Sequence, residues 1–217
     1  MNKKKRNFFI STILILLAVV FTILVKVVDV KQVGVNETNI GFASINQFVF
    51  KTIGVNIIWY HITDWLGLAP VFMAIAYSLI GIIQLITRKS IFKLDKEIII
   101  LGLFYIVVIF LYVFFEKVIV NYRPILMDGF LEASYPSSHT LMTICLCGSS
   151  IIVNKKLFNN NIAKFINILS LAIIFITVVG RLLSGVHWIT DIIGGIFISI
   201  ALLMTLYSVI DVIQKND

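Results

Sequence analysis

The chain has 217 residues, of which 59% are hydrophobic and only 13% are charged. A typical soluble domain has about 45 to 50% apolar and about 25% charged residues, so this composition excludes an ordinary soluble globule. The formal net charge of +7 is compatible with a nucleic-acid partner, but Lys and Arg also accumulate in the cytoplasmic loops of membrane proteins. We therefore expect a polytopic membrane protein with no nucleic-acid partner.

Six apolar segments are long enough to cross the roughly 30 Å of bilayer hydrocarbon as helices. The first follows a basic N-terminus as in a signal peptide, but it is longer than a usual signal segment and no small-residue cleavage site follows, so we expect a retained helix. The sequence thus predicts an all-α, six-helix membrane protein with a single domain over residues 1–217. The expected spans cover about residues 7–27, 66–87, 98–116, 139–154, 163–180 and 189–210.

The distribution of Lys and Arg predicts the orientation, because their excess marks the cytoplasmic side. Six spans place both ends of the chain on one side. The N-terminal segment, residues 88–96, residues 155–164 and the C-terminal tail carry twelve Lys and Arg residues, against six on the other side. We expect a multi-pass protein of the cell membrane with both termini in the cytoplasm.

The segment between the first two spans has the pattern of a short amphipathic helix. Apolar residues recur at helical spacing from Ile45 to Ile53, with Asn46 and Lys51 on the opposite side. Such a helix either lies in the membrane interface or packs over the outer ends of the spans. Further along, His61 and Asp64 either pack at the interface or line the entrance of a site.

Polar residues that do not suit a lipid-facing helix gather at the outer ends of spans three to six. Ionisable residues in a membrane are costly, about 2.5 to 3.5 kcal/mol each at a helix centre and less near the interface, so their accumulation predicts a site on the extracytoplasmic face. The residues concerned are Glu116, Lys117, Arg123, Pro124, Pro136, Ser137, Ser138, His139, Gly180, Arg181, His187 and Asp191.

The residue types in these segments fit phosphoryl transfer. Asp191 follows His187 by four residues at the start of a predicted helix, so its carboxylate can accept from one ring nitrogen and leave the other free as nucleophile or base. The guanidinium forks of Arg123 and Arg181 suit the oxygens of a phosphoryl group.

The segment from Pro136 to His139 adds an anion site to these groups. Pro136 suits the first position of a helix, and Ser137 and Ser138 follow it. The free backbone N–H groups and the positive end of the helix at this point can bind an anion. His139 can reach a leaving oxygen as general acid.

These three segments resemble the signature of the type 2 phosphatidic acid phosphatase family of membrane lipid phosphatases, which shares its site with glucose-6-phosphatase and vanadium haloperoxidases. The family pattern is Lys-x6-Arg-Pro, then Pro-Ser-Gly-His, then Ser-Arg-x5-His-x3-Asp. Here the first ends in Arg123-Pro124, the second reads Pro136-Ser137-Ser138-His139, and the third reads Gly180-Arg181, His187 and Asp191 at the family spacing.

The resemblance implies a lipid phosphatase that needs no metal and no cofactor. By analogy His187 attacks phosphorus, Asp191 orients it, and His139 protonates the departing oxygen and then activates water. Arg123, Arg181, Ser137 and Ser138 would hold the phosphate. The implied partners are membrane lipids and a lipid phosphate, with undecaprenyl diphosphate, phosphatidylglycerol phosphate and phosphatidic acid in the family's range.

The chain departs from the family pattern at three positions. Glu116 occupies the place of the family lysine, and Lys117 lies one position late, about 100° around a helix. We expect Glu116 to point elsewhere, and Lys117 to bend toward the phosphate or to anchor the helix at the interface. Gly180 replaces the family serine, and Ser138 replaces the glycine of the second motif. Asp128 and Glu132, in the loop between the first two motifs, are expected to be solvated charges or to meet a lipid headgroup.

Two other functions remain compatible with the sequence. A transporter would use the intramembrane charges to line a pathway, although here they cluster at one end rather than near the midplane. A catalytically weakened relative would bind phospholipid without turnover. Cys145 and Cys147 point to different faces of one helix and predict neither a disulfide nor a metal site.

Overall fold

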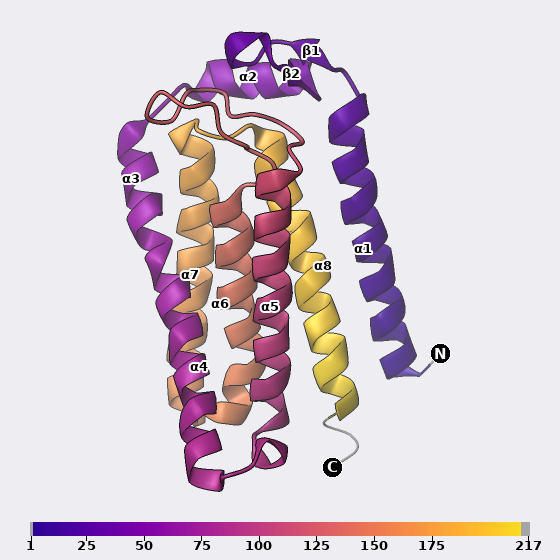
Figure 1. Ribbon diagram of the computed structural model, residues 1–217, viewed down its shortest axis with the longest axis vertical. Helices are drawn as coiled ribbons and strands as arrows, with labels where there is room; N and C mark the ends of the chain where they lie inside the picture. The colour runs from indigo at the N-terminus through magenta and orange to yellow at the C-terminus, as the bar shows by residue number, and fades with distance from the viewer. Residues whose placement is uncertain (1, 214–217) are drawn as a thin grey trace.

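The computed structural model describes residues 2–213 as an almost entirely helical bundle (Figure 1). Between α1 and α2, the strands β1 (Lys31–Gln32) and β2 (Asn39–Ile40) form a small antiparallel sheet in which Lys31 pairs with Ile40. Short 3-10 turns occupy Val35–Glu37 and Ile91–Lys93. The helices are α1 (Lys3–Val27), α2 (Ala43–Ile53), α3 (Ile57–Leu66), α4 (Leu68–Arg88), α5 (Lys96–Lys117), α6 (Ser138–Leu157), α7 (Asn160–Ser184) and α8 (Ile189–Ile213).

Within residues 2–213, five helical stretches are long and apolar enough to cross a membrane. They are α1, the α3–α4 pair, α5, α7 and α8. The fourth predicted span corresponds to α6, which does not meet this criterion, because it contains serines, threonines, an asparagine and two lysines. The structure therefore shows several membrane-crossing helices, with α6 distinguished from the others by its polarity.

Helix α6 lies at the centre of the bundle, in contact with α4, α5, α7 and α8. Most of its residues from Thr140 to Asn154 are buried, whereas large apolar side chains such as Phe110 of α5 and Phe175 of α7 are exposed on the outside. A bundle in a bilayer can expose apolar side chains to lipid and keep its polar groups inside, where neighbouring helices provide hydrogen-bond partners. This arrangement explains how a polar helix fits into a membrane bundle.

The second half of α6 belongs to a hydrogen-bonded group that we call the inner cluster. The Tyr77 hydroxyl of α4 donates to Asn154, whose amide donates to Asn167 of α7 at 2.7 Å. The hydroxyls of Ser150 and Ser170 are 3.1 Å apart. The inner cluster thus joins α4, α6 and α7 through five polar side chains.

The α3–α4 pair begins about nine residues earlier than the predicted second span, and Ile57–Arg88 forms one nearly continuous helical stretch. The side chain of Asn56 caps its start by accepting from the backbone N–H groups of Ile58 and Trp59. The first helix of this pair, α3, packs along α7. Asp64 is therefore a helical residue beside α7.

Helix α2 confirms the predicted amphipathic helix and lies across one end of the bundle, which we call the outer end (Figure 1). Its Asn46 is buried and donates to Thr190 of α8 at 2.9 Å, whereas Ile45 and Phe48 are exposed. Helix α2 therefore packs over the outer end of α8 through its polar side and presents apolar residues outward.

Candidate active site

The segment between α5 and α6, residues 118–137, folds over the outer end of the bundle (Figure 1). Tyr122 and Ala133 form an isolated antiparallel bridge, and the N–H of Arg123 donates to the carbonyl of Glu132 at 3.1 Å. This pairing also brings the two side chains together, with Arg123 Nε 3.1 Å from Glu132 Oε2. Arg123 thus reaches the site from a hairpin-like loop, and Glu132 is paired rather than simply solvated.

His187 lies in the short turn between α7 and α8, which several contacts hold in place. Gly185 ends α7 with a positive φ of 67° and packs so closely on the backbone of Gly54 that a side chain there would collide. The Trp188 indole donates to the carbonyl of Tyr122 at 2.7 Å, which ties this turn to the loop carrying Arg123. The His187 side chain is consequently buried.

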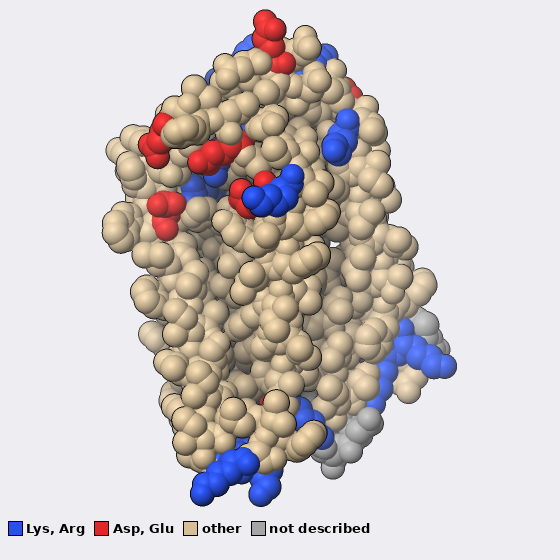
Figure 2. Space-filling model, viewed as in Figure 1, with Lys and Arg blue, Asp and Glu red and all other residues tan. Residues whose placement is uncertain are grey.

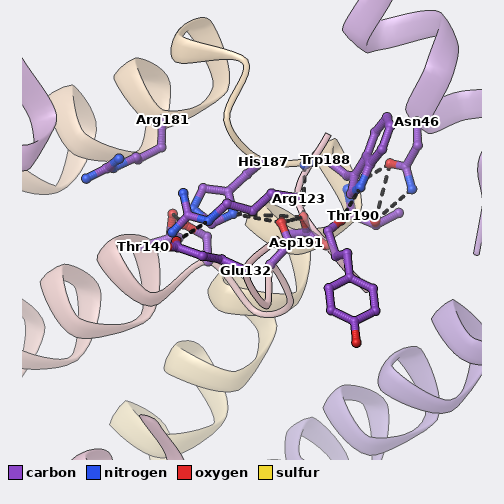
Figure 3. Close-up of polar contacts among 12 residues, drawn as sticks. Asn46, Arg123, Glu132, Thr140, Arg181, His187, Trp188, Thr190 and Asp191 are labelled. Carbon is purple, nitrogen blue, oxygen red and sulfur yellow. Dashed lines mark hydrogen bonds and ion pairs between the residues drawn. The ribbon is translucent and has the colours of Figure 1, made fainter. Parts of the chain in front are cut away.

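Asp191 acts on His187 through an intervening serine. The Ser134 hydroxyl donates to Asp191 Oδ2 at 2.5 Å and lies 3.0 Å from His187 Nδ1. Figure 3 labels the two residues that this serine joins, His187 and Asp191. The direct distance from Nδ1 to Asp191 Oδ2 is 3.9 Å, so the hydrogen bond predicted from the four-residue spacing is not formed. That spacing brings side chains together only within a helix, and α8 begins at Ile189, after His187.

The Ser134 contact fixes which nitrogen of His187 carries the proton. A serine hydroxyl has one hydrogen, and here it points to the carboxylate of Asp191. Nδ1 of His187 must then donate to Ser134, which leaves a lone pair on Nε2. Burial, and then the positive charges of Arg123 and Arg181, hold the pKa of His187 well below its ordinary value. The ring is therefore neutral, and Nε2 can act as a nucleophile.

Asp191 also fixes the start of α8. Its Oδ2 accepts the backbone N–H of Trp188 at 2.9 Å, as the third helical residue does in a capping box. Its own carbonyl accepts the N–H of Ser137 at 3.0 Å, so the start of α8 holds the start of α6. One acidic residue thus orders both segments that carry the predicted histidines.

Helix α6 begins at Ser138, with Ser137 as its N-cap. Pro136 therefore stands before the N-cap and not at the first helical position predicted for it. Because the first N–H groups of a helix have no partner within it, the amides of residues 138–140 point outward at a positive helix end. Ser138 lines a small cavity together with Ser134, His187 and Glu116.

His139 and Arg181 meet at a carboxylate of α3. Asp64 Oδ1 is 3.2 Å from His139 Nε2 and also 3.2 Å from Arg181 Nη2. Arg181 is completely buried, and its guanidinium lies over the ring of Tyr60, 5.2 Å from the centroid. Of the two readings that the sequence leaves open for Asp64, these contacts favour a position at the site.

The four residues Arg123, His139, Arg181 and His187, which we call the outer site, share one property. Among residues 2–213, the following buried atoms of these side chains have no hydrogen-bond partner: Arg123 Nη1, Arg181 Nε and Nη1, His139 Nδ1 and His187 Nε2. Buried polar groups are normally paired, so a set of unpaired N–H donors on two cationic side chains indicates an anion ligand. The described residues contain no group of three or more His, Cys, Asp and Glu that could hold a metal ion.

The structure does not bring every predicted residue into the outer site. Lys117 is exposed at the end of α5 and does not line the cavity beside His187. Glu116, expected to point away, lines that cavity instead. Ser134 belongs to the site but to none of the three motifs, and the only signal for it in the sequence is its place two residues before Pro136. His61 is exposed and contacts only the neighbouring ring of Tyr60 among the described aromatic pairs.

A bundle of apolar helices with unpaired cationic side chains buried at one end defines an integral membrane protein with a candidate anion site. The chain belongs to the PAP2 superfamily, whose family model matches residues 97–215. This match confirms the resemblance seen in the motifs. No curated protein sequence matches the chain significantly.

A solved structure supports the same assignment at the level of the fold. The chain is similar to the crystal structure of a transmembrane PAP2-type phosphatidylglycerolphosphate phosphatase from Bacillus subtilis, with a TM-score of 0.63 and 16% sequence identity. The match covers 93% of this chain and 96% of that chain. The protein therefore has the fold of a PAP2-type membrane phosphatase.

Proposed function

We propose that the protein is a lipid phosphate phosphatase that works through a phosphohistidine on His187. The observation that carries this proposal is the group of unpaired nitrogen atoms in the outer site. A phosphoryl group has the oxygens to accept from both guanidinium forks while its phosphorus faces a neutral imidazole. The PAP2 superfamily membership and fold support the same reaction class.

In the first step, the lone pair of His187 Nε2 attacks phosphorus and the bond from phosphorus to the lipid oxygen breaks. Protonated His139 gives its proton to the departing oxygen, so that an alcohol leaves, or a lipid phosphate when the substrate is a diphosphate. Ser134 and Asp191 hold the attacking ring in its tautomer. Arg123, Arg181, the hydroxyl of Ser137 and the free amide of Ser138 stabilise the charge on the phosphoryl oxygens.

In the second step, His139 takes a proton from water as the water oxygen attacks the phosphorylated His187. The bond between phosphorus and Nε2 breaks, inorganic phosphate leaves, and both histidines return to their starting states. The scheme requires no metal, because arginines and the start of α6 meet the charge of the phosphate. Lys117, exposed at the end of α5, is assigned to contact with the lipid headgroup.

We further propose that α6 is a sixth crossing and that residues 1–217 form one domain with the outer site on the extracytoplasmic face. Figure 2 shows Lys and Arg with almost no Asp or Glu at the end of the bundle opposite to the outer site, whereas charges of both signs lie at the outer end. The described ends of the chain lie at that basic end in Figure 1. Such an excess marks the cytoplasmic side. A membrane-impermeant maleimide should label Asp128→Cys in intact cells, and Phe92→Cys only after permeabilisation.

Phosphate release from a panel of lipids tests the reaction itself. Undecaprenyl diphosphate, phosphatidylglycerol phosphate and phosphatidic acid in detergent cover the expected substrates, each with and without EDTA. We expect release from at least one lipid, unaffected by EDTA, and a phosphorylated histidine on rapid quenching. His187→Ala should abolish both signals, and His61→Ala, an exposed histidine outside the outer site, should retain them. Binding without turnover in the wild type would contradict the proposal.

A further inference from the structure

Asp64 places a negative charge directly beside the catalytic groups proposed above. A single oxygen, Oδ1, contacts both His139 Nε2 and Arg181 Nη2 at 3.2 Å. The side chain of Arg181 is fully buried, whereas that of Asp64 is 48% exposed. Asp64 therefore stands between the buried guanidinium and the mouth of the site.

Close packing of α3 on α7 holds Asp64 in this position. At Gly180, one residue before Arg181, an added Cβ would lie 3.0 Å from the Trp59 ring and closer still to Thr63. Gly180 stands where the family pattern has serine, and a serine here would push α3 away. At Gly67, an added Cβ would lie 2.9 Å from the His139 ring. Two glycines thus let α3 approach both residues that Asp64 contacts.

Carboxylates surround the cationic groups on this face of the molecule. Figure 2 shows acidic side chains over α3, the end of α5 and the loop above them, with basic atoms set back between them. Glu132 pairs with Arg123, Asp64 pairs with Arg181, and Glu116 lines the cavity beside His187. Each arginine is therefore already paired with one carboxylate before any phosphate binds, and a third carboxylate lies beside His187.

In the proposed reaction, His139 stands beside the departing oxygen, so Asp64 faces the departing group. An alcohol is neutral and can share the hydrogen bonds of Asp64 and His139. The departing group of a diphosphate is a second phosphate, and its negative charge would face a carboxylate in a partly buried site, where like charges repel strongly.

We infer that Asp64 is a specificity-determining residue that favours lipid phosphomonoesters over lipid diphosphates. This inference rests on the proposed function and deepens it by naming the substrate class. Selectivity arises from a repulsive element against the wrong substrate as well as from contacts with the right one.

Farnesyl phosphate and farnesyl diphosphate test the inference, because they share one tail and differ only in the second phosphate. We expect the wild-type protein in detergent to show the higher kcat/KM for the monophosphate. Asp64→Asn keeps the size of the side chain and removes the charge, so it should raise kcat/KM for the diphosphate about tenfold. Asp64→Ser should shift it in the same direction, and Asp64→Glu should retain the wild-type preference.

Asp128→Asn is the matched control, since it removes the same charge from an exposed loop residue on the same side of the molecule. It should leave the ratio of the two kcat/KM values unchanged, and an equal rise in this variant would overturn the inference. A wild-type protein with the higher kcat/KM for the diphosphate would also overturn the inference. The same holds if Asp64→Asn and Asp64→Ser show no rise in kcat/KM for the diphosphate, including the case in which both variants lose both activities. Wild-type protein inactive on both farnesyl lipids and on the lipid panel would instead contradict the proposed function.

Discussion

Helix α6 begins in the outer site and ends in the inner cluster, so a single helix buries polar side chains in two regions of the bundle. In the inner cluster, Asn154 accepts from Tyr77 and donates to Asn167, and Ser150 pairs with Ser170. No buried side-chain atom of these five residues lacks a partner in the described chain. In the outer site, all four side chains keep unpaired nitrogen atoms.

The difference shows that burial of polar groups does not by itself identify a functional site in a membrane bundle. A network of neutral side chains in which every polar group has a hydrogen-bond partner holds helices together. Buried donors on cationic side chains that remain unpaired are stable only where a ligand or a nearby carboxylate compensates them. We therefore expect changes in the outer site to reduce activity and changes in the inner cluster to reduce stability.

The largest expected effect is the loss of activity on replacing Arg181. Arg181→Leu removes the buried guanidinium that we assign to the phosphate, and kcat/KM for the preferred lipid should fall about 10² to 10³-fold. Stability should not fall, because the variant exchanges a desolvated charge for an apolar side chain and leaves the half-exposed Asp64 in contact with water. Phosphate release and thermal unfolding in the same detergent measure the two quantities.

Arg181→Lys is the matched comparison, since it retains the charge but not the planar fork. It should keep more activity than Arg181→Leu and less than the wild type. A variant in which activity and unfolding temperature fall together would show that Arg181 mainly supports the fold, and the contrast between the two regions would not hold.

The second prediction concerns Ser134, which joins Asp191 to His187. Ser134→Ala removes the acceptor that holds the Nδ1 proton, so kcat should fall about 10- to 100-fold. Because Asp191 acts on the ring through this hydroxyl, Asp191→Asn should cost less in the Ser134→Ala background than in the wild type. Strictly additive losses in the double variant would show that the two residues act independently.

A pH profile gives the third prediction. The neutral form of His187 is the nucleophile, so protonation of the ring stops the first step. Its pKa in the ligand-free protein lies well below the ordinary value, and the acidic limb of kcat/KM, which reports the free enzyme, should therefore lie below pH of about 6.5. Arg123→Gln removes one of the positive charges that lower this pKa, so the pKa should rise and the limb should move up by about one pH unit.

Arg88→Gln, at the opposite end of the bundle where Arg88 pairs with Asp95, is the control for this profile and should leave the limb in place. An acidic limb that does not move in Arg123→Gln would show that a different group, or the substrate, sets it.

Much of this architecture follows from local pattern. Apolar runs of sufficient length predict the outer helices, and the motif residues His139, Arg181 and His187 follow from their spacing. The prediction of a direct hydrogen bond between His187 and Asp191 was wrong, because it applied the four-residue spacing of a helix to His187, which lies in the turn before α8. The second span, expected over residues 66–87, corresponds to α4, and the structure adds α3 as a helix directly before it.

Two residues of the site depend on contacts that no local pattern contains. Ser134 lies in an irregular segment, and its position follows from the bridge between Tyr122 and Ala133 and from the anchoring of that loop by Trp188. Asp64 reaches the site because α3 packs closely on α7 at Gly180. The substitution at Gly180 was visible in the sequence, but only the structure connects it with the approach of Asp64.

The smallest expected effect is a loss of stability in the inner cluster. Asn154→Leu keeps the branching of the side chain at Cγ but leaves the Tyr77 hydroxyl and the Asn167 amide without their partner, which should lower the free energy of unfolding by about 1 kcal/mol. The kcat/KM of the folded protein should stay within about twofold of the wild type, because the inner cluster lies at the far end of α6 from His139. Unfolding in detergent and phosphate release by the folded fraction measure both, with Asn167→Leu and the double variant completing a cycle that isolates the pair. Asn154→Leu could instead reduce activity as strongly as Arg181→Leu while stability was unchanged. The inner cluster would then take part in catalysis, and the pairing of buried polar groups would not distinguish structural residues from site residues in this protein.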